Sequence, residues 1–428
     1  MGKHNNNDNH SKKEEPFPYE FGGPIGALAT TLALPVVVMW LLQMGRVGAI
    51  NFDFVQELCD DDKCAALTLV KCTLGLLSWF LFKVLLWYVL PGPIVQGAPV
   101  HGDKKNTLPY KLNGHLSFWA VVGLVFGFQI PLNEFLYKYF EPLAMCDIAL
   151  CLAMSLYMYT NSFHPKGKIL AKGGDSGNLI YDHFMGRELN PRWGDFDWKV
   201  FCELRPGLVG WMLLNIACAQ EQLAVHGSIS GSMYLVNIFQ GIYVWDAQYQ
   251  ERAILTTMDV TTDGFGYMLV FGDLAWVPFT YSLQAKYLVN YDPNLSSISL
   301  GIILALHILG FYIFRGANGQ KDKFRRNPND PAVSHLLYLQ TKRGTKLLTS
   351  GWWGMARKIN YTGDWLMGLT WCLVCGFDSI VPYFYAIYFC ILLVHRSMRD
   401  DEMCAHKYGD DWLEYKRQVP YRFIPGVI

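Results

Sequence analysis

The stretch PIGALATTLALPVVVMWLLQM, residues 24–44, carries no charged side chain. Its 21 residues have the length of a transmembrane helix, since about 20 apolar helical residues cross the hydrocarbon core of a bilayer. A single apolar block of this kind can also form the core of a soluble protein. The blocks that follow it along the chain decide between the two, because a soluble protein needs polar surface to cover such blocks.

About ten such blocks occur in the 428 residues. They span residues 24–44, 65–90, 115–136, 143–159, 208–225, 233–249, 265–288, 298–314, 366–377 and 381–394. Only 17% of the residues are charged, against about a quarter in a soluble domain. The sequence therefore predicts an all-α, polytopic integral membrane protein with about ten transmembrane helices. The last two blocks are short, and we expect them to form a helical hairpin.

The polar remainder of the chain excludes several kinds of protein. Lysine plus arginine and aspartate plus glutamate both number 36, so we expect no nucleic-acid partner. The scattered cysteines, several of them inside apolar blocks, are expected to be small core residues in a reducing environment. No metal site is predicted. Residues 1–22 are polar and are expected to be disordered.

A basic and aromatic connection follows the eighth block. Residues 315–346 hold eight basic and two acidic residues, which is typical of a loop that stays in the cytosol. That rule does not explain the next stretch, LLTSGWWGMARKINYTGDW at residues 347–365. A linker would be poorer in tryptophan, and a membrane span would be poorer in charge. This stretch therefore predicts one wall of a binding site for a flat, anionic ligand.

Ionisable residues accompany the sixth and seventh blocks, where charge is costly. Tyr243, Asp246 and Gln250 have i, i+3, i+7 spacing and so share one helical face. An interfacial helix end with an aromatic belt is the alternative. In the seventh block, Asp273 stands among apolar residues, and Pro278 is expected to bend the helix. A bent helix with a buried acid suits a cavity within the membrane.

The C-terminal segment is HRSMRDDEMCAHKYGDDWLEYKRQVPYRFIPGVI, from residue 395. Arg396, Arg399 and Asp400 have i, i+3, i+4 spacing, which places them on one helical face. Arginine offers a rigid fork of donors for phosphate, and a neighbouring acid binds ribose hydroxyls in dinucleotide sites. A solvated amphipathic helix with internal salt bridges is the alternative. Without a GxGxxG or Walker motif, a nucleotide would not bind through a Rossmann turn or a P-loop.

Four segments resemble the sterol reductases of the ergosterol and cholesterol pathways. GFGYMLVFGDLAWVPFTYSLQ, from residue 264, and LLTSGWWGMARKINYTGDW are similar to the two signatures of that family. GNLIYDHFMGRELNPR, from residue 177, and the C-terminal segment resemble two further blocks. The resemblance covers residues 24–428. LLTSGWWG followed by NYTGDWLMG is most similar to the branch that acts at C-14, since the C-7 branch usually has Phe where Trp352 stands.

The resemblance implies NADPH as the cofactor, held in a C-terminal pocket that faces the cytosol. It implies a membrane domain over residues 23–428, with sterol-pocket helices at 233–314 and the NADPH-binding part at 315–428. The residues that match the cofactor motifs are Lys321, Arg325, Trp352, Asn360, Tyr361, Asp364, Arg396, Arg399, Asp400, Tyr408 and Tyr415. The sequence departs from the family at Lys358, where many members have His.

The resemblance also implies a multi-pass protein of the endoplasmic reticulum membrane. Its expected partners are membrane lipids and a sterol substrate drawn from the bilayer. Other enzymes of the sterol pathway are candidate partners.

The chemistry of sterol reduction points to further residues. An isolated alkene does not accept hydride, so protonation must first give a tertiary cation at C14. The site needs a well-placed acid in a dry pocket, with aromatic faces or carboxylates near the positive charge. Tyr243 with Asp246 is the first candidate for proton delivery, and Asp400 is the second.

The sterol is expected to enter laterally from the lipid, beside Tyr267, Trp276 and Phe279. Plain packing is the alternative role for these three side chains.

Three other interpretations compete. The most serious is a C-7 or C-24(28) sterol reductase of the same family. A non-catalytic sterol-binding receptor with the same fold would be expected to lose Lys321, Arg325 or Arg396, and all three are present. Isoprenylcysteine methyltransferases have a similar C-terminal pattern but are much smaller and lack the GDLAWVPF block.

Overall fold

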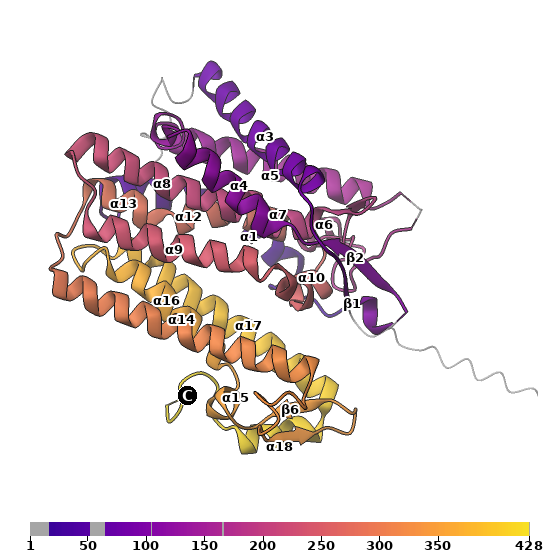
Figure 1. Ribbon diagram of the computed structural model, residues 1–428. Helices are drawn as coiled ribbons and strands as arrows, with labels where there is room; N and C mark the ends of the chain where they lie inside the picture. Colours follow the sequence, from indigo (N-terminus) through magenta and orange to yellow (C-terminus); the bar gives the residue numbers. More distant parts are fainter. Residues whose placement is uncertain (1–16, 52–64, 104, 165–166, 428) are drawn as a thin grey trace, which may run out of the picture.

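The computed structural model describes residues 17–51, 65–103, 105–164 and 167–427. Helices dominate this part of the chain and fall into two groups (Figure 1). The first group, α1 to α13, occupies the upper part of Figure 1, and the C-terminal group, α14 to α18, lies below it.

The first group is built from helices of very different lengths. Its α-helices are α1 (Gly23–Val47), α3 (Ala66–Val89), α4 (Gly114–Gly127), α5 (Phe140–Asn161), α6 (Leu179–Met185), α7 (Trp198–Leu204), α8 (Pro206–His226), α9 (Gly231–Tyr249), α10 (Met258–Thr261), α11 (Tyr267–Phe271), α12 (Val277–Tyr281) and α13 (Leu283–Asn290). The C-terminal group comprises α14 (Ser297–Arg326), α15 (Trp352–Met355), α16 (Ile359–Leu373), α17 (Phe384–Tyr408) and α18 (Asp410–Gln418). The shorter turns are η1 (Val100–Gly102), η2 (Leu132–Glu134), η3 (Glu251–Thr256), η4 (Gly272–Trp276) and η5 (Val381–Tyr383).

Six of the described helices are long and apolar enough to cross a membrane. They are Gly23–Val47, Ala66–Val89, Phe140–Asn161, Trp198–His226, Ser297–Arg326 and Val381–Tyr408. These six coincide with the first, second, fourth, fifth, eighth and tenth blocks of the sequence. The third and ninth blocks form the shorter helices α4 and α16, and the sixth forms α9, which carries buried polar side chains. A multi-pass, mostly helical membrane protein is therefore confirmed, while ten crossings remain a prediction.

The seventh block forms no continuous helix. A π-helical turn, η4, separates α11 from α12 and carries Asp273. Pro278 lies in the first turn of α12, where its missing N–H is tolerated. A Cβ atom on Gly207 of α8 would lie 1.7 Å from the Asp273 carbonyl oxygen, so glycine is required where α8 passes this turn. The expected bend is thus a π turn, a feature found frequently at functional sites.

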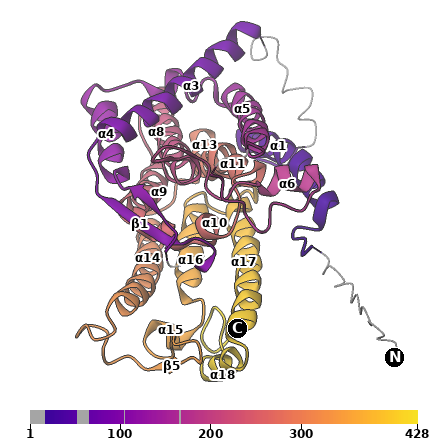
Figure 2. The same ribbon diagram turned by 90° about the vertical axis from the view of Figure 1, so that its right-hand side faces the viewer.

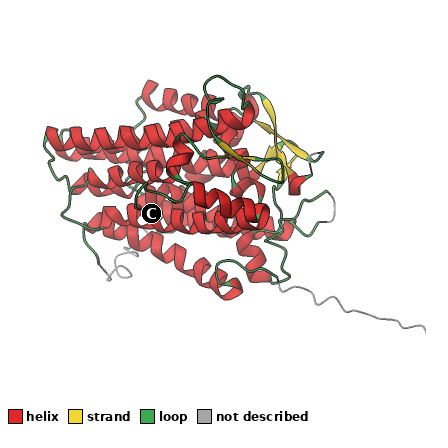
Figure 3. Ribbon diagram, turned by 90° about the horizontal axis from the view of Figure 1, so that it is seen from below, coloured by secondary structure: helices red, strands yellow, loops and turns green. Residues whose placement is uncertain are grey.

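Small strands modify the expected all-α class. Three two-stranded antiparallel hairpins join β1 (Ile94–Pro99) to β2 (Thr107–Lys111), β3 (Arg192–Trp193) to β4 (Phe196–Asp197), and β5 (Tyr338–Gln340) to β6 (Lys346–Leu348). Figure 3 shows them as small additions to a helical body. They lie in the connections between helices. The pattern of apolar blocks in the sequence does not predict such short strand pairs.

The segment before α1 lies against the helical body. The Tyr19 ring packs edge-on against Tyr181 with centroids 4.8 Å apart, and the Glu20 N–H donates to the Tyr181 hydroxyl at 2.9 Å. The expectation of disorder is therefore wrong for residues 17–22. Residues 1–16 lie outside the described part of the chain.

Helices α14 and α16 cross at close range. A Cβ atom on Gly363 would lie 2.6 Å from the Phe314 backbone nitrogen, and one on Gly310 would lie 2.9 Å from the Gly363 oxygen. These glycines let the two backbones approach, as close helix crossings in membranes require. Because Asn318 contacts Asn360 further along, the two helices are antiparallel. This packing fixes the positions of the residues that flank the crossing on α14 and on α16.

Candidate active site

Three C-terminal helices converge below the loop that follows α9. In Figure 2, α14, α16 and α17 stand beneath α10, and α16 packs against both α14 and α17. Most residues predicted to bind the cofactor lie on these helices or at their ends.

The two arginines of α17 pair with two aspartates of the loop. Arg396 Nη2 donates to Asp259 Oδ2 at 2.7 Å, and Arg399 Nη2 donates to Asp263 Oδ1 at 3.2 Å. Arg399 also forms an ion pair with Glu20 at 2.7 Å. The i, i+3 spacing therefore turns both guanidinium groups toward the same loop, and each is held in a fixed direction.

Asp400 faces a different neighbour. Lys358, at the start of α16, pairs with the Asp400 carboxylate. Lys358 thus supplies a positive charge to one of the acids predicted for catalysis. Asp400 is a partner of Lys358 here, next to the basic residues of α14.

Two basic side chains of α14 have no carboxylate partner. Lys321 and Arg325 lie one turn apart, and neither forms an ion pair with any residue in the described part of the chain. The Lys321 ammonium lies 4.1 Å from the centre of the Trp353 ring. The Trp353 indole N–H donates to the Ala317 carbonyl at 2.8 Å. This arrangement leaves positive charge available for an anionic ligand.

Two acceptors on α16 are buried without donors. Asn360 Nδ2 donates to Asn318 Oδ1 at 3.3 Å, but Asn360 Oδ1 has no partner among the described residues. Asp364 Oδ1, one helical turn further on, is also buried without a hydrogen-bond partner among these residues. A buried polar atom without a partner costs about 1–3 kcal/mol, so both oxygens are suited to donors on a ligand.

Trp352 and Tyr361 flank these acceptors. The Trp352 backbone N–H bonds Gln320 Oε1 at 2.9 Å. A Cβ atom on Gly316 would lie 2.8 Å from Trp352 Nε1, so the indole covers α14 at that glycine. The Lys358 ammonium lies 5.6 Å from the centre of the Tyr361 ring. Trp352 therefore lies against α14, and Tyr361 stands beside the basic side chain of Lys358.

The two acidic groups of α9 reach different helices. Tyr243 lies next to Asp364 of α16, and the two groups interact electrostatically. Asp246 faces α14, where Arg315 Nε lies 3.4 Å from its Oδ1. The structure thus joins Tyr243 to a residue predicted for cofactor binding, while Asp246 is neutralised by an arginine.

Aromatic rings surround the Tyr243 side of this pair. The Tyr243 ring centroid lies 5.2 Å from that of Trp371 and 6.1 Å from that of Trp211. Tyr385 packs 4.9 Å from Trp371, and Tyr281 packs 4.7 Å from Tyr385. Tyr243 and Asp364 are both partly buried, and several π faces meet beside Tyr243.

Tyr408 and Tyr415 lie at the opposite end of the C-terminal group. Their rings lie 6.4 Å and 5.1 Å from the Trp412 ring, in a cluster that also packs on β5 and β6. Burial raises the pKa of Tyr415 to about 12. Their part in cofactor binding remains a prediction, and their observed contacts are with this cluster.

The three residues predicted for sterol binding do not gather around one space. Tyr267 packs against His183 with centroids 5.9 Å apart, and Trp276 packs 5.1 Å from Tyr388. Phe279 alone lines a large cavity on the other side of α12. Their part in sterol binding remains a prediction.

Comparison with known proteins identifies the family. The model of the "ergosterol biosynthesis ERG4/ERG24 family" matches residues 15–428. The chain belongs to this family. It is 48% identical to the delta(14)-sterol reductase of Schizosaccharomyces pombe, covering 97% of this chain and 98% of that one. It is 43% identical to the delta(14)-sterol reductase of Mus musculus, covering 97% and 99%.

A longer relative shares the same region. The delta(14)-sterol reductase of Gallus gallus is 46% identical over 95% of this chain, and the match covers 63% of that protein. The resemblance of the four sequence segments to the ERG4/ERG24 sterol reductases is therefore confirmed.

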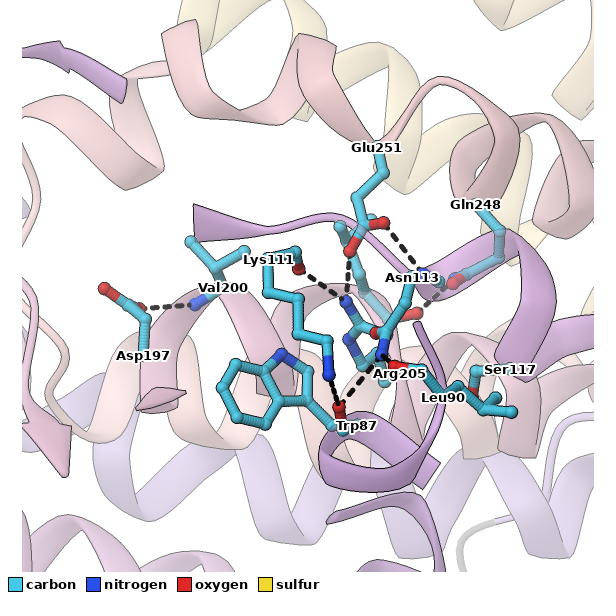
Figure 4. Close-up of polar contacts among 12 residues, drawn as sticks. Trp87, Leu90, Lys111, Asn113, Ser117, Asp197, Val200, Arg205, Gln248 and Glu251 are labelled. Atoms are coloured by element: carbon cyan, nitrogen blue, oxygen red, sulfur yellow. Dashed lines mark hydrogen bonds and ion pairs between the residues drawn. The ribbon is translucent and has the colours of Figure 1, made fainter. Parts of the chain in front are cut away.

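A buried ion pair holds the start of the loop that carries Asp259 and Asp263 (Figure 4). Arg205 of α8 pairs with Glu251 of η3, and its Nη1 donates to Asn113 Oδ1 at 2.7 Å. The Gly114 N–H donates to Glu251 Oε2 at 2.8 Å. Burial raises the pKa of Glu251, an effect that Arg205 opposes. The network fixes where the loop leaves α9.

Replacement of Arg205 by Leu is expected to lower the free energy of unfolding by about 3–5 kcal/mol, because it leaves the buried Glu251 carboxylate unpaired. The measurement is thermal unfolding of purified protein in detergent. Arg417→Gln is the matched control, since Arg417 is 78% exposed and, among the described residues, pairs only with Glu414 at the surface. Equal stability of the two variants would contradict the structural role assigned to Arg205.

The sequence did not predict which residues of the site interact with one another in several cases. Asp259 and Asp263 were visible as costly acids after α9, but their partners lie on α17, 137 and 136 positions away. In the sequence, Arg315 is only one of the eight basic residues of 315–346, and nothing singles out Asn318. The i, i+4 spacing of Asp259 and Asp263 was the one local signal that both serve the same helix.

A Cys-x-x-Cys pair in α16 and the turn after it was overlooked in the sequence. Cys372 and Cys375 are both buried, and the Cys372 thiol donates to the Gly368 carbonyl at 3.5 Å. Their neighbours are core residues. Across residues 17–427, apart from the gaps named above, no group of three or more potential metal ligands occurs.

Proposed function

We propose that this protein is an NADPH-dependent reductase of the C14=C15 double bond of a sterol intermediate. The observation that carries the proposal is the Tyr243–Asp364 pair. The pair links Tyr243, which stands among aromatic rings, to Asp364 on α16. The turn that precedes α16 faces the unpaired basic groups of α14. The chain matches the delta(14)-sterol reductases of Schizosaccharomyces pombe and Mus musculus along nearly their whole length.

The polar residues between α14, α16 and α17 fit NADPH. Lys321 and Arg325 offer unpaired positive charge to phosphate, and Arg396 and Arg399 are preset by Asp259 and Asp263. The orphaned oxygens of Asn360 and Asp364 are acceptors, which match the hydroxyl and carboxamide donors of a dinucleotide. When bound, the reduced nicotinamide supplies hydride to the sterol.

Proton delivery falls to the Tyr243–Asp364 pair. A proton passes from the tyrosine hydroxyl to C15 of the sterol, the double bond supplies the electron pair, and C14 becomes a tertiary cation. Asp364, in its protonated form, then gives a proton back to the tyrosinate, and its carboxylate takes up a replacement proton from the solvent side. Asp246 and Asp400 are less suited to this step, because each is paired with a cation, Arg315 or Lys358.

The aromatic rings around Tyr243 stabilise the cation. The faces of Trp211, Trp371, Tyr281 and Tyr385 provide negative π density, and a cation over such a face gains about 2 kcal/mol or more when desolvated. Dryness also protects the cation from capture by water.

The same proposal covers the placement of the protein in the cell. We infer about ten membrane crossings, with the basic ends of α14 and α17 on the cytosolic side. The expected location is the endoplasmic reticulum membrane, where the sterol substrate enters from the lipid and other sterol-pathway enzymes are candidate partners.

The test is turnover of two sterols, one with a C14–C15 and one with a C7–C8 double bond, by purified protein with NADPH. We expect reduction of the 14-ene alone, measured by mass spectrometry of the products, and its loss in Arg396→Ala. Reduction of the 7-ene or of a C24(28) double bond instead would replace the substrate but keep the cofactor site. Absence of both turnover and NADPH binding would favour a sterol-binding receptor.

A further inference from the structure

A large apolar cavity lies within the first helix group. It has a volume of about 450 Å³ and is enclosed by α3, η2, α5, α8 and the η4–α12 segment. Figure 1 shows α3, α5 and α8 in the upper part of the molecule, on the side of α9 away from α14 and α16. The volume is that of a small-molecule pocket, which typically measures about 300–1,000 Å³.

The cavity is separate from the candidate active site. None of the residues assigned to the cofactor or to proton delivery lines it. Of the three residues predicted for the sterol, only Phe279 does so. The η4–α12 segment therefore presents one side to the cavity and, through Trp276, another to α17.

The walls of the cavity are flat and held in place. Trp79 of α3 is fixed by a hydrogen bond from its Nε1 to the Pro206 carbonyl at 3.1 Å. Phe80 and Phe135 add two further rings. A Cβ atom on Gly210 would make ordinary contact with Trp79 Nε1, at 3.7 Å, so the missing side chain of Gly210 leaves the space open beside this ring.

Asp147 is the one ionisable residue in the lining. It lies inside α5, one of the six membrane-crossing helices. No hydrogen bond or ion pair joins its side chain to any residue in the described ranges. A carboxyl group within a membrane span is expensive unless it has a polar partner, and such groups mark functional sites. The missing partner is therefore expected on a ligand.

We propose that this cavity binds a second sterol molecule, whose hydroxyl group hydrogen-bonds to Asp147. A sterol has one hydroxyl and a rigid flat ring system, which match one polar group and walls of aromatic rings. An acyl chain of a phospholipid would leave Asp147 without a partner, and a fatty acid would add a second carboxyl. The outer face of α3 carries exposed leucines such as Leu74 and Leu81, so the helix that lines the cavity is suited to contact lipid. The proposal does not depend on the double bond that the enzyme reduces.

The test uses the full chain in lipid nanodiscs with a photoreactive sterol that keeps its hydroxyl group. We expect mass spectrometry to find labelled peptides from α5 or α8. Labelling should be lost in Asp147→Leu and in the cavity-filling variant Gly210→Leu, and kept in Asp147→Asn, whose amide still bonds a hydroxyl. A 3-deoxy sterol should compete about tenfold more weakly, the effect of one hydrogen bond.

NADPH-dependent sterol turnover separates this site from the active site. We expect Gly210→Leu to lose labelling and to keep turnover. Loss of both in a variant that still elutes as folded protein would show that the cavity is the substrate site and overturn the proposal. Unlabelled α5 and α8 peptides in the wild type would overturn it too. So would labelling of the same peptides by a photoreactive phospholipid that excess sterol does not reduce.

Discussion

Replacement of Tyr243 by Phe is expected to lower kcat by about 10²–10⁴, the usual contribution of a general acid. The phenyl ring keeps the packing on Trp371 but has no proton to give to the alkene. Asp364→Asn should give a loss of similar order, because an amide cannot relay a proton to Tyr243. The measurement is single-turnover reduction of the 14-ene sterol by purified enzyme preloaded with NADPH, followed by mass spectrometry.

Tyr385→Phe is the matched control for this loss. Tyr385 also packs on Trp371, and its replacement removes a nearby hydroxyl but leaves that of Tyr243 in place. We expect the control to retain most of its kcat, and all three variants to bind NADPH. If Tyr243→Phe retained more than about a third of wild-type kcat, the loss would be smaller than the range expected for a general acid. The proton would then have to come from elsewhere. Asp246→Asn and Asp400→Asn would then be tested next.

The membrane architecture was accessible from the sequence because apolar length is a local property. Each of the six long apolar helices coincides with a predicted block. The block at 265–288 shows the limit of that reasoning. Its hydropathy resembles that of a span, yet Asp273 and Pro278 lie within a π turn and the start of a new helix. Which backbone hydrogen bonds are exchanged there depends on α8, whose Gly207 passes the turn, and the sequence of the block does not contain that information.

The candidate site was accessible in a different way. Helical spacing correctly placed Arg396 and Arg399 on one face, and resemblance to the family added Lys321 and Arg325 as a pair. Spacing did not reveal the partners. The interaction between Tyr243 and Asp364 joins α9 to α16, and Asp246, one turn from Tyr243, turns to Arg315 of α14 instead. Contacts between helices far apart in the chain depend on crossing geometry, which a single sequence does not specify.

The order of groups along α14 and α16 suggests how the cofactor is oriented. The two helices are antiparallel, with Asn318 opposite Asn360. Lys321 lies beyond this level toward the end of α14, and Asp364 lies about one turn of 5.4 Å on the other side of it. The reduced ring must lie near the proton donor. The two unpaired cations are therefore expected at the adenosine end, where NADPH differs from NADH by a 2′-phosphate.

The double variant Lys321→Gln with Arg325→Gln is accordingly expected to weaken NADPH binding about 100-fold and to change NADH binding less than about threefold. Each charge-assisted hydrogen bond contributes about 1.5–3 kcal/mol, and about 1.4 kcal/mol corresponds to a tenfold change in Kd. Titration of the purified protein with both cofactors, at low and at high salt, measures the difference. The loss for NADPH should shrink at high salt, because screening weakens the wild-type contacts.

Lys323→Gln provides the matched control, since Lys323 lies between the two residues in sequence but is exposed on another face of α14. It removes one positive charge from the same helix, where the double variant removes two, so a general field effect would weaken NADPH binding in this variant as well. Equal losses per charge removed in Lys323→Gln and in the double variant would show that the basic end of α14 acts only through its net charge. If only the double variant lost affinity, and lost it equally for NADPH and NADH, Lys321 and Arg325 would be assigned to the pyrophosphate and not to the 2′-phosphate. Only selective loss of NADPH, confined to Lys321 and Arg325, fits the orientation inferred from α14 and α16.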